Sequence, residues 1–171
     1  MGIRTFPVAG DMVLLSTTAI TNVASISIAG IDQTYNELVI VIENAATVNT
    51  NSSMRLQFNS NTTGGQYAWT NLYDGATVHA STSGSDLTTA IPIGTTANVN
   101  SFNQVLRITR YTSTTRKVIK WWAAYINATA SGQTVNQGVG SFLGSAAITS
   151  VQLFPVGNWT AQGNIYIYGV K

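Results

Sequence analysis

Residues 107–127, RITRYTSTTRKVIKWWAAYIN, contain five of the eight basic side chains and two of the four tryptophans in a chain of 171 residues. Polar and apolar residues alternate on both sides of TSTT, which predicts two β-strands joined by a turn. Arg107 and Arg110 fall on the first strand, and Arg116, Lys117 and Lys120 fall on the second. These charges crowd the turn end, where a hairpin meets water. Either this end is a solvated tip beside buried tryptophans, or it contacts a ligand or partner.

The same alternation recurs along the chain. It is seen in ASISIAG (24–30), SSMRLQFNS (52–60), FNQVLRITRY (102–111), AAITSVQLFP (146–155) and GNIYIYGVK (163–171). Turns rich in Gly, Asn, Ser and Thr separate these segments, and no stretch has a convincing helical period. The pattern predicts one all-β domain over residues 1–171, an antiparallel β-sandwich of jelly-roll type with about nine strands.

Two segments are apolar on both faces, ELVIVIEN (37–44) and RKVIKWWAAYINA (116–128). The outer face of a two-layer sandwich is normally polar, so an apolar outer face predicts a cover, and another subunit is the expected one. Trp121 and Trp122 should point to opposite faces, one into the core and one into this interface. The candidate interface residues are Val39, Val41, Val118, Trp122, Ala124 and Ile126.

Composition excludes several classes of function. Charged residues make up 8% of the chain, against roughly 25% in ordinary soluble domains, and Ser, Thr, Asn and Gly replace them. A net charge of +2 is too small to hold a phosphate backbone by electrostatics, so we expect no specific nucleic-acid partner. No apolar run approaches the roughly 20 residues of a membrane span, and no membrane partner is expected.

Catalytic and metal-binding patterns are missing from the sequence. His79 is the one histidine, in a segment that looks like a loop, there is no cysteine, and the six carboxylates are scattered. We therefore expect no enzyme, no metal and no cofactor. A sugar site is the better candidate, in GGQYAWTNLYDGATVH (64–79), where Tyr67, Trp69 and Tyr73 stand among amides. The competing interpretation is that these aromatic residues pack within a strand.

The N-terminal segment differs from the rest of the chain. Residues 1–12, MGIRTFPVAGDM, show no strand alternation and carry Pro7, which cannot donate to a ladder. An extended arm is expected, with the sandwich over about residues 13–171. The arm should lie across a neighbouring subunit or a capsid surface, and its candidate contacts are Ile3, Arg4, Phe6 and Val8.

The chain resembles the small β-sandwich virion proteins of tailed bacteriophages, of decoration, head-fibre or tail-fibre type. The likeness rests on ordered blocks: SISIAGIDQTYNELVIVIE (25–43), MRLQFNSNTTGGQYAW (54–69) and AAITSVQLFPVGNWTAQGNIYIYGVK (146–171). The first twenty residues depart from the family pattern, and residues 101–126 match it in outline only. No functional residue is carried over.

The resemblance implies a non-enzymatic structural role in the virion. The expected function is a capsid decoration or cement protein that packs against neighbouring subunits on the capsid surface, with the major capsid protein or other virion proteins as partners. Threefold positions are common docking points for such proteins, so a homotrimer is expected. The alternative is a tail-fibre or receptor-binding module, located on the tail, that recognises a host surface glycan.

Overall fold

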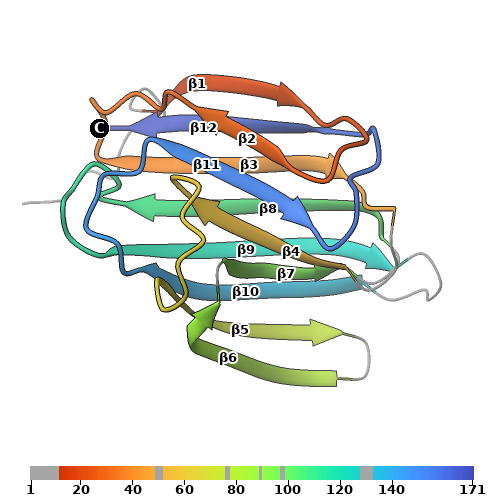
Figure 1. Ribbon diagram of the computed structural model, residues 1–171. Coiled ribbons are helices and arrows are strands. Elements are labelled where there is room, and N and C mark those ends of the chain that lie inside the picture. The colour runs from red at the N-terminus through yellow and green to blue at the C-terminus, as the bar shows by residue number, and fades with distance from the viewer. Residues whose placement is uncertain (1–11, 49–51, 76–77, 89, 97–98, 128–132) are drawn as a thin grey trace, which may run out of the picture.

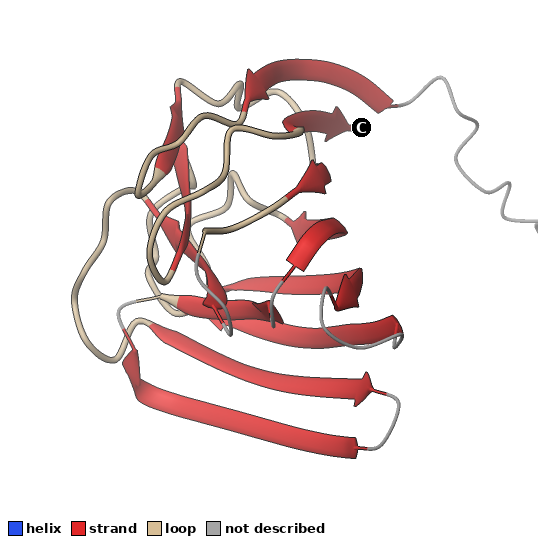
Figure 2. Cartoon of the chain, turned by 90° about the vertical axis from the view of Figure 1, so that its right-hand side faces the viewer, coloured by secondary structure: helices blue, strands red, loops and turns tan. Residues whose placement is uncertain are grey.

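Two antiparallel β-sheets make up the part of the chain that the computed structural model describes, residues 12–48, 52–75, 78–88, 90–96, 99–127 and 133–171. Figures 1 and 2 show strands and loops in these residues and no helix. The strands are β1 (Met12–Ala19), β2 (Ile26–Ala29), β3 (Glu37–Ala45), β4 (Ser52–Phe58), β5 (Tyr67–Gly75), β6 (Val78–Thr88), β7 (Ile91–Thr96), β8 (Val99–Thr109), β9 (Lys117–Asn127), β10 (Gln133–Phe142), β11 (Ser150–Pro155) and β12 (Asn164–Val170).

Eight of these strands form a jelly roll. The order β1-β12-β3-β8 in the larger sheet faces the order β2-β11-β4-β7 in the smaller sheet. Each antiparallel pair therefore joins an earlier strand to a later one: β1 with β12, β2 with β11, β3 with β8 and β4 with β7. This pairing arises when one long antiparallel hairpin rolls up into two four-stranded sheets, which is the arrangement called a jelly roll. The predicted all-β sandwich is confirmed.

Two further hairpins extend the larger sheet. Beyond β8 it continues through β9, β10, β5 and β6 to eight strands, and in Figure 1 β5 and β6 lie below the smaller sheet. The described residues thus contain twelve strands rather than about nine. The segment around His79, expected to be a loop, contributes to β6 instead, because pairing with β5 stabilises a polar strand of weak propensity.

The core lies between the two sheets and follows the sequence alternation. Along β12, Ile165 and Ile167 are buried between half-buried residues, and along β11 the same pattern places Val151 and Leu153 inside. Trp159, fully buried in the loop between those strands, lies 6.2 Å from the ring of Phe102, centroid to centroid. Aromatic and aliphatic side chains from both sheets therefore fill the space between the layers.

Tyr67 is a core residue rather than part of a surface sugar site. Its side chain is fully buried, and its ring stacks on Phe142 with a centroid distance of 5.2 Å. Its hydroxyl donates to the carbonyl oxygen of Asn61 at 3.0 Å and accepts from the amide of Phe58 at 3.1 Å. The hydroxyl therefore anchors the turn between β4 and β5.

This burial predicts a measurable response to alkaline pH. Burial raises the pKa of Tyr67 above its usual 10.0, so the phenol stays protonated in the folded state after it has ionised in the unfolded one. Its contribution to stability is complete below about pH 10 and is lost as the pH rises through the folded pKa. Tyr67→Phe should reduce the fall in unfolding free energy between neutral and alkaline pH, measured by urea titration. Equal falls in both proteins would contradict this.

Candidate functional site

The outer face of the larger sheet, which points away from the smaller sheet, is the candidate site. Strand register places one row of side chains across it: Trp122 on β9 is opposite Val105 on β8 and Gln137 on β10, and Gln137 is opposite Leu72 on β5. Side chains two residues away along each strand share the same face. Residues distant in the chain thus meet on one surface.

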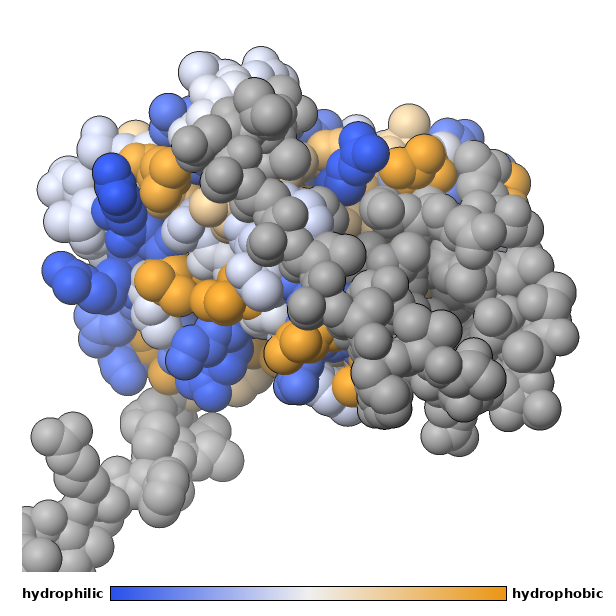
Figure 3. Space-filling view, turned by 90° about the horizontal axis from the view of Figure 1, so that it is seen from below, coloured by the Kyte–Doolittle hydropathy of each residue, from blue (hydrophilic) through white to orange (hydrophobic). Residues whose placement is uncertain are grey.

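Five large apolar side chains are exposed on this face, and together we call them the outer patch. Their exposed fractions are Leu72 52%, Trp122 47%, Val139 45%, Val118 44% and Val135 38%. Figure 3, which views the molecule from below, shows apolar groups exposed among polar ones. Single exposed apolar residues are ordinary, but several on neighbouring strands mark an interaction surface.

Trp121 and Trp122 point to opposite faces, as predicted. Trp121 is 4% exposed and lies on the inner face, where its indole Nε1 donates to the side-chain oxygens of Asn71 and Asn136, both at 3.0 Å. Trp122 is in the outer patch. The first tryptophan therefore holds the added hairpins to the core, and the second is available to a partner.

Two basic residues lie at the outer patch, Arg107 beside it and Lys120 within it. Arg107 forms a bidentate pair with Glu37, at 2.7 Å and 2.8 Å, and this hydrogen bond raises the pKa of the guanidinium. Lys120 is exposed between Val118 and Trp122 along β9, and among the described residues it has no carboxylate partner. The surface thus offers a cation within an apolar environment.

A shallow depression lies on the same face. Its volume is about 340 Å³, and it is lined by Thr70, Leu72, Lys120, Trp121, Gln137, Gly138 and Val139. An ammonium, an amide and a hydroxyl thus surround an apolar floor. This combination of a few polar groups on apolar walls is typical of small-ligand sites.

The predicted interface residues do not all offer surface. Val118 and Trp122 are exposed, and Val41 and Ala124 are half-buried. Val39 is 6% exposed, which corrects its assignment, because the long side chains of its register neighbours Tyr168 and Arg107 flank it. The structure does not describe the side chain of Ile126.

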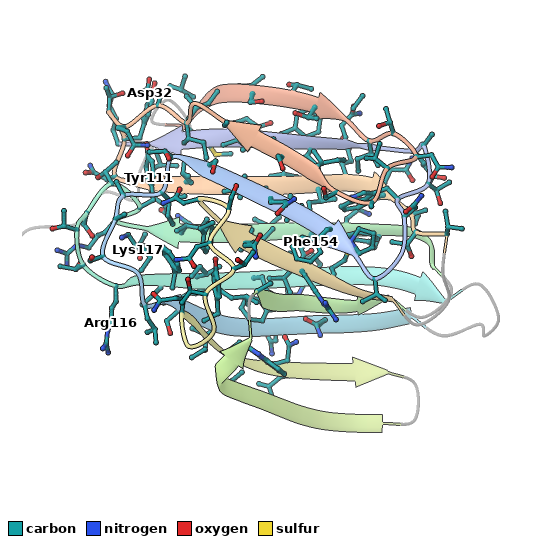
Figure 4. All side chains as sticks on the ribbon, in the orientation of Figure 1. Asp32, Tyr111, Arg116, Lys117 and Phe154 are labelled. Atoms are coloured by element: carbon teal, nitrogen blue, oxygen red, sulfur yellow. The ribbon has the colours of Figure 1, made fainter. Side chains whose placement is uncertain are left out.

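The basic hairpin divides into exposed and buried charges. Arg107, Arg110, Arg116 and Lys120 are exposed, but Lys117 is fully buried and is not a surface contact. Its ammonium donates to the carbonyl oxygens of Gly144 and Ala146, and burial lowers its pKa. In Figure 4, Arg116 extends away from the protein, whereas Lys117 lies among interior side chains.

At the candidate sugar site around β5, Tyr67 and Trp69 follow the competing interpretation and pack within the protein. Tyr67 is in the core, and Trp69 is only partly buried but packs against that core. The side chain of Tyr73 is outside the described part of the structure. The arm residues Ile3, Arg4, Phe6 and Val8 also lie outside the described residues.

Within the described residues, no group of three or more His, Cys, Asp or Glu side chains could hold a metal ion. No helix in that part of the chain is long and apolar enough to cross a membrane.

Sequence reasoning missed three members of the outer patch, Leu72, Val135 and Val139. For the two valines the signal was present: in TVNQGVG, residues 134–140, Val135, Gln137 and Val139 alternate on one face, and the glycines are on the other. The two glycines make the segment look like a loop, because glycine is unfavourable in strands. Trp121 and Ile91 occupy the space beside Gly138 and Gly140.

Comparison with known proteins assigns no family. No family model matches the chain, and no curated protein matches its sequence. Among solved structures, the CBM40 of a Ruminococcus gnavus IT-sialidase is 11% identical, with 93% of each chain covered and a TM-score of 0.34. A protein of unknown function from Shewanella oneidensis MR-1 is 9% identical, with 99% of this chain and 83% of that chain covered and a TM-score of 0.24. Both TM-scores are too low to indicate a shared fold.

Proposed function

We propose that this chain is a non-enzymatic structural protein of a tailed-phage virion, a capsid decoration or cement protein that packs against neighbouring subunits through the outer patch. The observation that carries the proposal is the exposure of Leu72, Val118, Trp122, Val135 and Val139 on one sheet face. A surface of this kind is unfavourable in water and becomes stable when another protein covers it.

The size of the patch suits an assembly made of many copies. The five side chains are 38–52% exposed, so covering what remains of each contributes roughly half of the full-burial value, about 0.8–1.5 kcal/mol. Association costs at least about 4 kcal/mol in lost freedom of motion. A single contact through the outer patch is therefore weak, but many such contacts in one assembly together bind strongly. The low charge of the chain, 8% of residues, limits repulsion between crowded copies.

The fold and the sequence blocks point the same way. Jelly rolls are common in viral capsid proteins, although lectins share the architecture. The blocks at residues 25–43, 54–69 and 146–171, which resemble phage virion proteins, coincide with β2–β3, the β4–β5 connection and β11–β12. The resemblance thus falls mainly on the jelly roll.

Light scattering of the purified protein tests the proposal. At micromolar concentration, the wild-type chain should be an oligomer, a trimer or a multiple of it, and it should bind to capsids that lack it. Val139→Lys should weaken both properties by tenfold or more, because a charge would be buried in the contact. Val156→Lys is the matched control, since Val156 is 43% exposed and Val139 is 45% exposed.

Three outcomes separate the alternatives. A wild-type monomer that does not bind capsids would overturn the proposal, as would equal effects of Val139→Lys and Val156→Lys. Binding to tails rather than heads would place the protein in a fibre.

The depression supports glycan recognition as a second candidate function. Lys120, Gln137 and Thr70 could bind hydroxyl or carboxylate groups while a sugar ring lies on Leu72 and Val139. A glycan array should then give a specific signal that Gln137→Ala abolishes. No signal on the array, together with normal assembly of Gln137→Ala, would leave the packing role alone.

A further inference from the structure

Lys120 supplies the charge of the depression on the outer face of the larger sheet, since the other described residues that line it are uncharged. Its side chain is exposed, and three apolar side chains surround it. Val118 and Trp122 share its face of β9, and Val139 lies opposite it on β10. Apolar neighbours exclude water from one side of an ammonium group and so strengthen its attraction for an anion. The position therefore favours an anionic ligand over a neutral one.

Lys120 differs from the two other lysines of the chain in its contacts. Lys117 donates to two backbone carbonyl oxygens, and Lys171 lies 5.9 Å from the centroid of an aromatic ring. Arg107, the register partner of Lys120 on β8, is neutralised by its bidentate pair with Glu37. Within the described part of the chain, Lys120 has neither a hydrogen-bond acceptor nor a carboxylate partner. An incoming anion therefore meets one cation that no other group has neutralised.

The remaining side chains of the depression form two rows across the strands. Lys120, Val139 and Thr70 are register partners in one row, and Gln137 and Leu72 are opposite each other in the next. Neighbouring strands are about 4.7–4.9 Å apart, so the Cα atoms of Lys120 and Thr70, two strands apart, are separated by about 9–10 Å. A ring that lies on Val139 therefore has an ammonium group on one side and neutral polar groups on the other.

We propose that the depression binds a uronic acid, a sugar that carries a carboxylate. This inference rests on glycan recognition, the second function proposed above, and names the class of sugar. The Lys120 ammonium donates to the carboxylate, and such a charge-assisted hydrogen bond is stronger than one to a neutral hydroxyl. Thr70 and Gln137 bind ring hydroxyls, and the apolar side of the ring lies on Val139 and Leu72. In a uronic acid, the carboxylate and two of the ring hydroxyls lie on opposite sides of the ring, as these groups require.

The number of charges in the depression suits a carboxylate better than a phosphate. A phosphate monoester carries about −1.5 to −2 charges at neutral pH and is bound best by several donors, of which the planar arginine fork is the most suitable. Here Arg107 is engaged by Glu37, and Lys120 is a single point charge. One ammonium group matches one carboxylate.

Titration calorimetry with an oligogalacturonate and with its methyl ester tests the inference, because the ester removes the charge and keeps the sugar. The wild-type chain should bind the acid at least tenfold more tightly than the ester. Lys120→Gln should abolish this preference. Arg116→Gln, which removes the same charge from an exposed residue that extends away from the protein (Figure 4), should retain it. Binding of the acid should also weaken as the salt concentration rises.

The outcomes distinguish this inference from the functions proposed above. Equal binding of acid and ester would refute the role of the carboxylate and leave glycan recognition intact, whereas binding of neither would overturn the inference and leave glycan recognition to the array. Equal losses in Lys120→Gln and Arg116→Gln, or tighter binding of a sulfated galactan oligomer, would also overturn it. Lys120→Gln should not weaken oligomerisation, so the packing role through the outer patch is measured independently.

Discussion

Trp121→Ala is expected to lower the free energy of unfolding by about 3–5 kcal/mol, the usual cost of removing a large core aromatic side chain. Trp121 is 4% exposed, and its indole is the hydrogen-bond donor to both Asn71 and Asn136. The substitution would leave a cavity on the inner face of β9 and β10 and would remove one hydrogen-bond donor from each of two buried side chains. Chemical denaturation monitored by circular dichroism measures the loss.

Trp122→Ala is the matched control for this prediction. Trp122 is adjacent in sequence but 47% exposed, so its removal should change the unfolding free energy by less than about 1 kcal/mol. Under the proposed function, it should weaken oligomerisation and capsid binding instead. Equal destabilisation by both substitutions, with assembly intact, would contradict the assignment of the two faces.

Gly163→Ala is the second substitution with a large expected effect. Gly163 precedes β12 and has a φ of +84°, a conformation that costs other residues about 1–3 kcal/mol. An added Cβ would also overlap the carbonyl oxygens of Glu43 and Asn44 at the end of β3. Because those atoms are backbone, relief requires a shift of the β3–β12 pair, which adds about 1–3 kcal/mol.

Two other glycines separate these contributions. Gly30 has a φ of +70° and open space around its Cβ position, so Gly30→Ala measures backbone strain alone. Gly64 has open space and no such φ, and Gly64→Ala should change stability by no more than about 0.5 kcal/mol. The expected order of destabilisation is Gly163, then Gly30, then Gly64. If Gly163→Ala costs no more than Gly30→Ala, the close approach to β3 is not rigid.

Local sequence patterns were sufficient for several parts of the structure. Alternation predicted β2, β4, β8, β11 and β12, and runs apolar on both faces predicted β3 and β9. The orientation of Trp121 and Trp122 followed from their adjacency in one strand. Around His79 the polar sequence favoured a loop, and that prediction was wrong, because the segment forms β6. For residues 134–140, which contain two glycines, the sequence analysis predicted no strand.

The sequence by itself determined the all-β class, the jelly-roll expectation and which neighbouring side chains share a face, because a strand has a period of two residues. The tertiary structure decided which strands lie side by side. The β9–β10 hairpin follows β8 through short local connections, whereas the β5–β6 hairpin joins β10 through contacts between residues far apart in the chain. Only that arrangement brings Leu72, Trp122 and Val139 onto one surface. Strand order depends on burial and hydrogen bonding across the whole fold, and no local period encodes it.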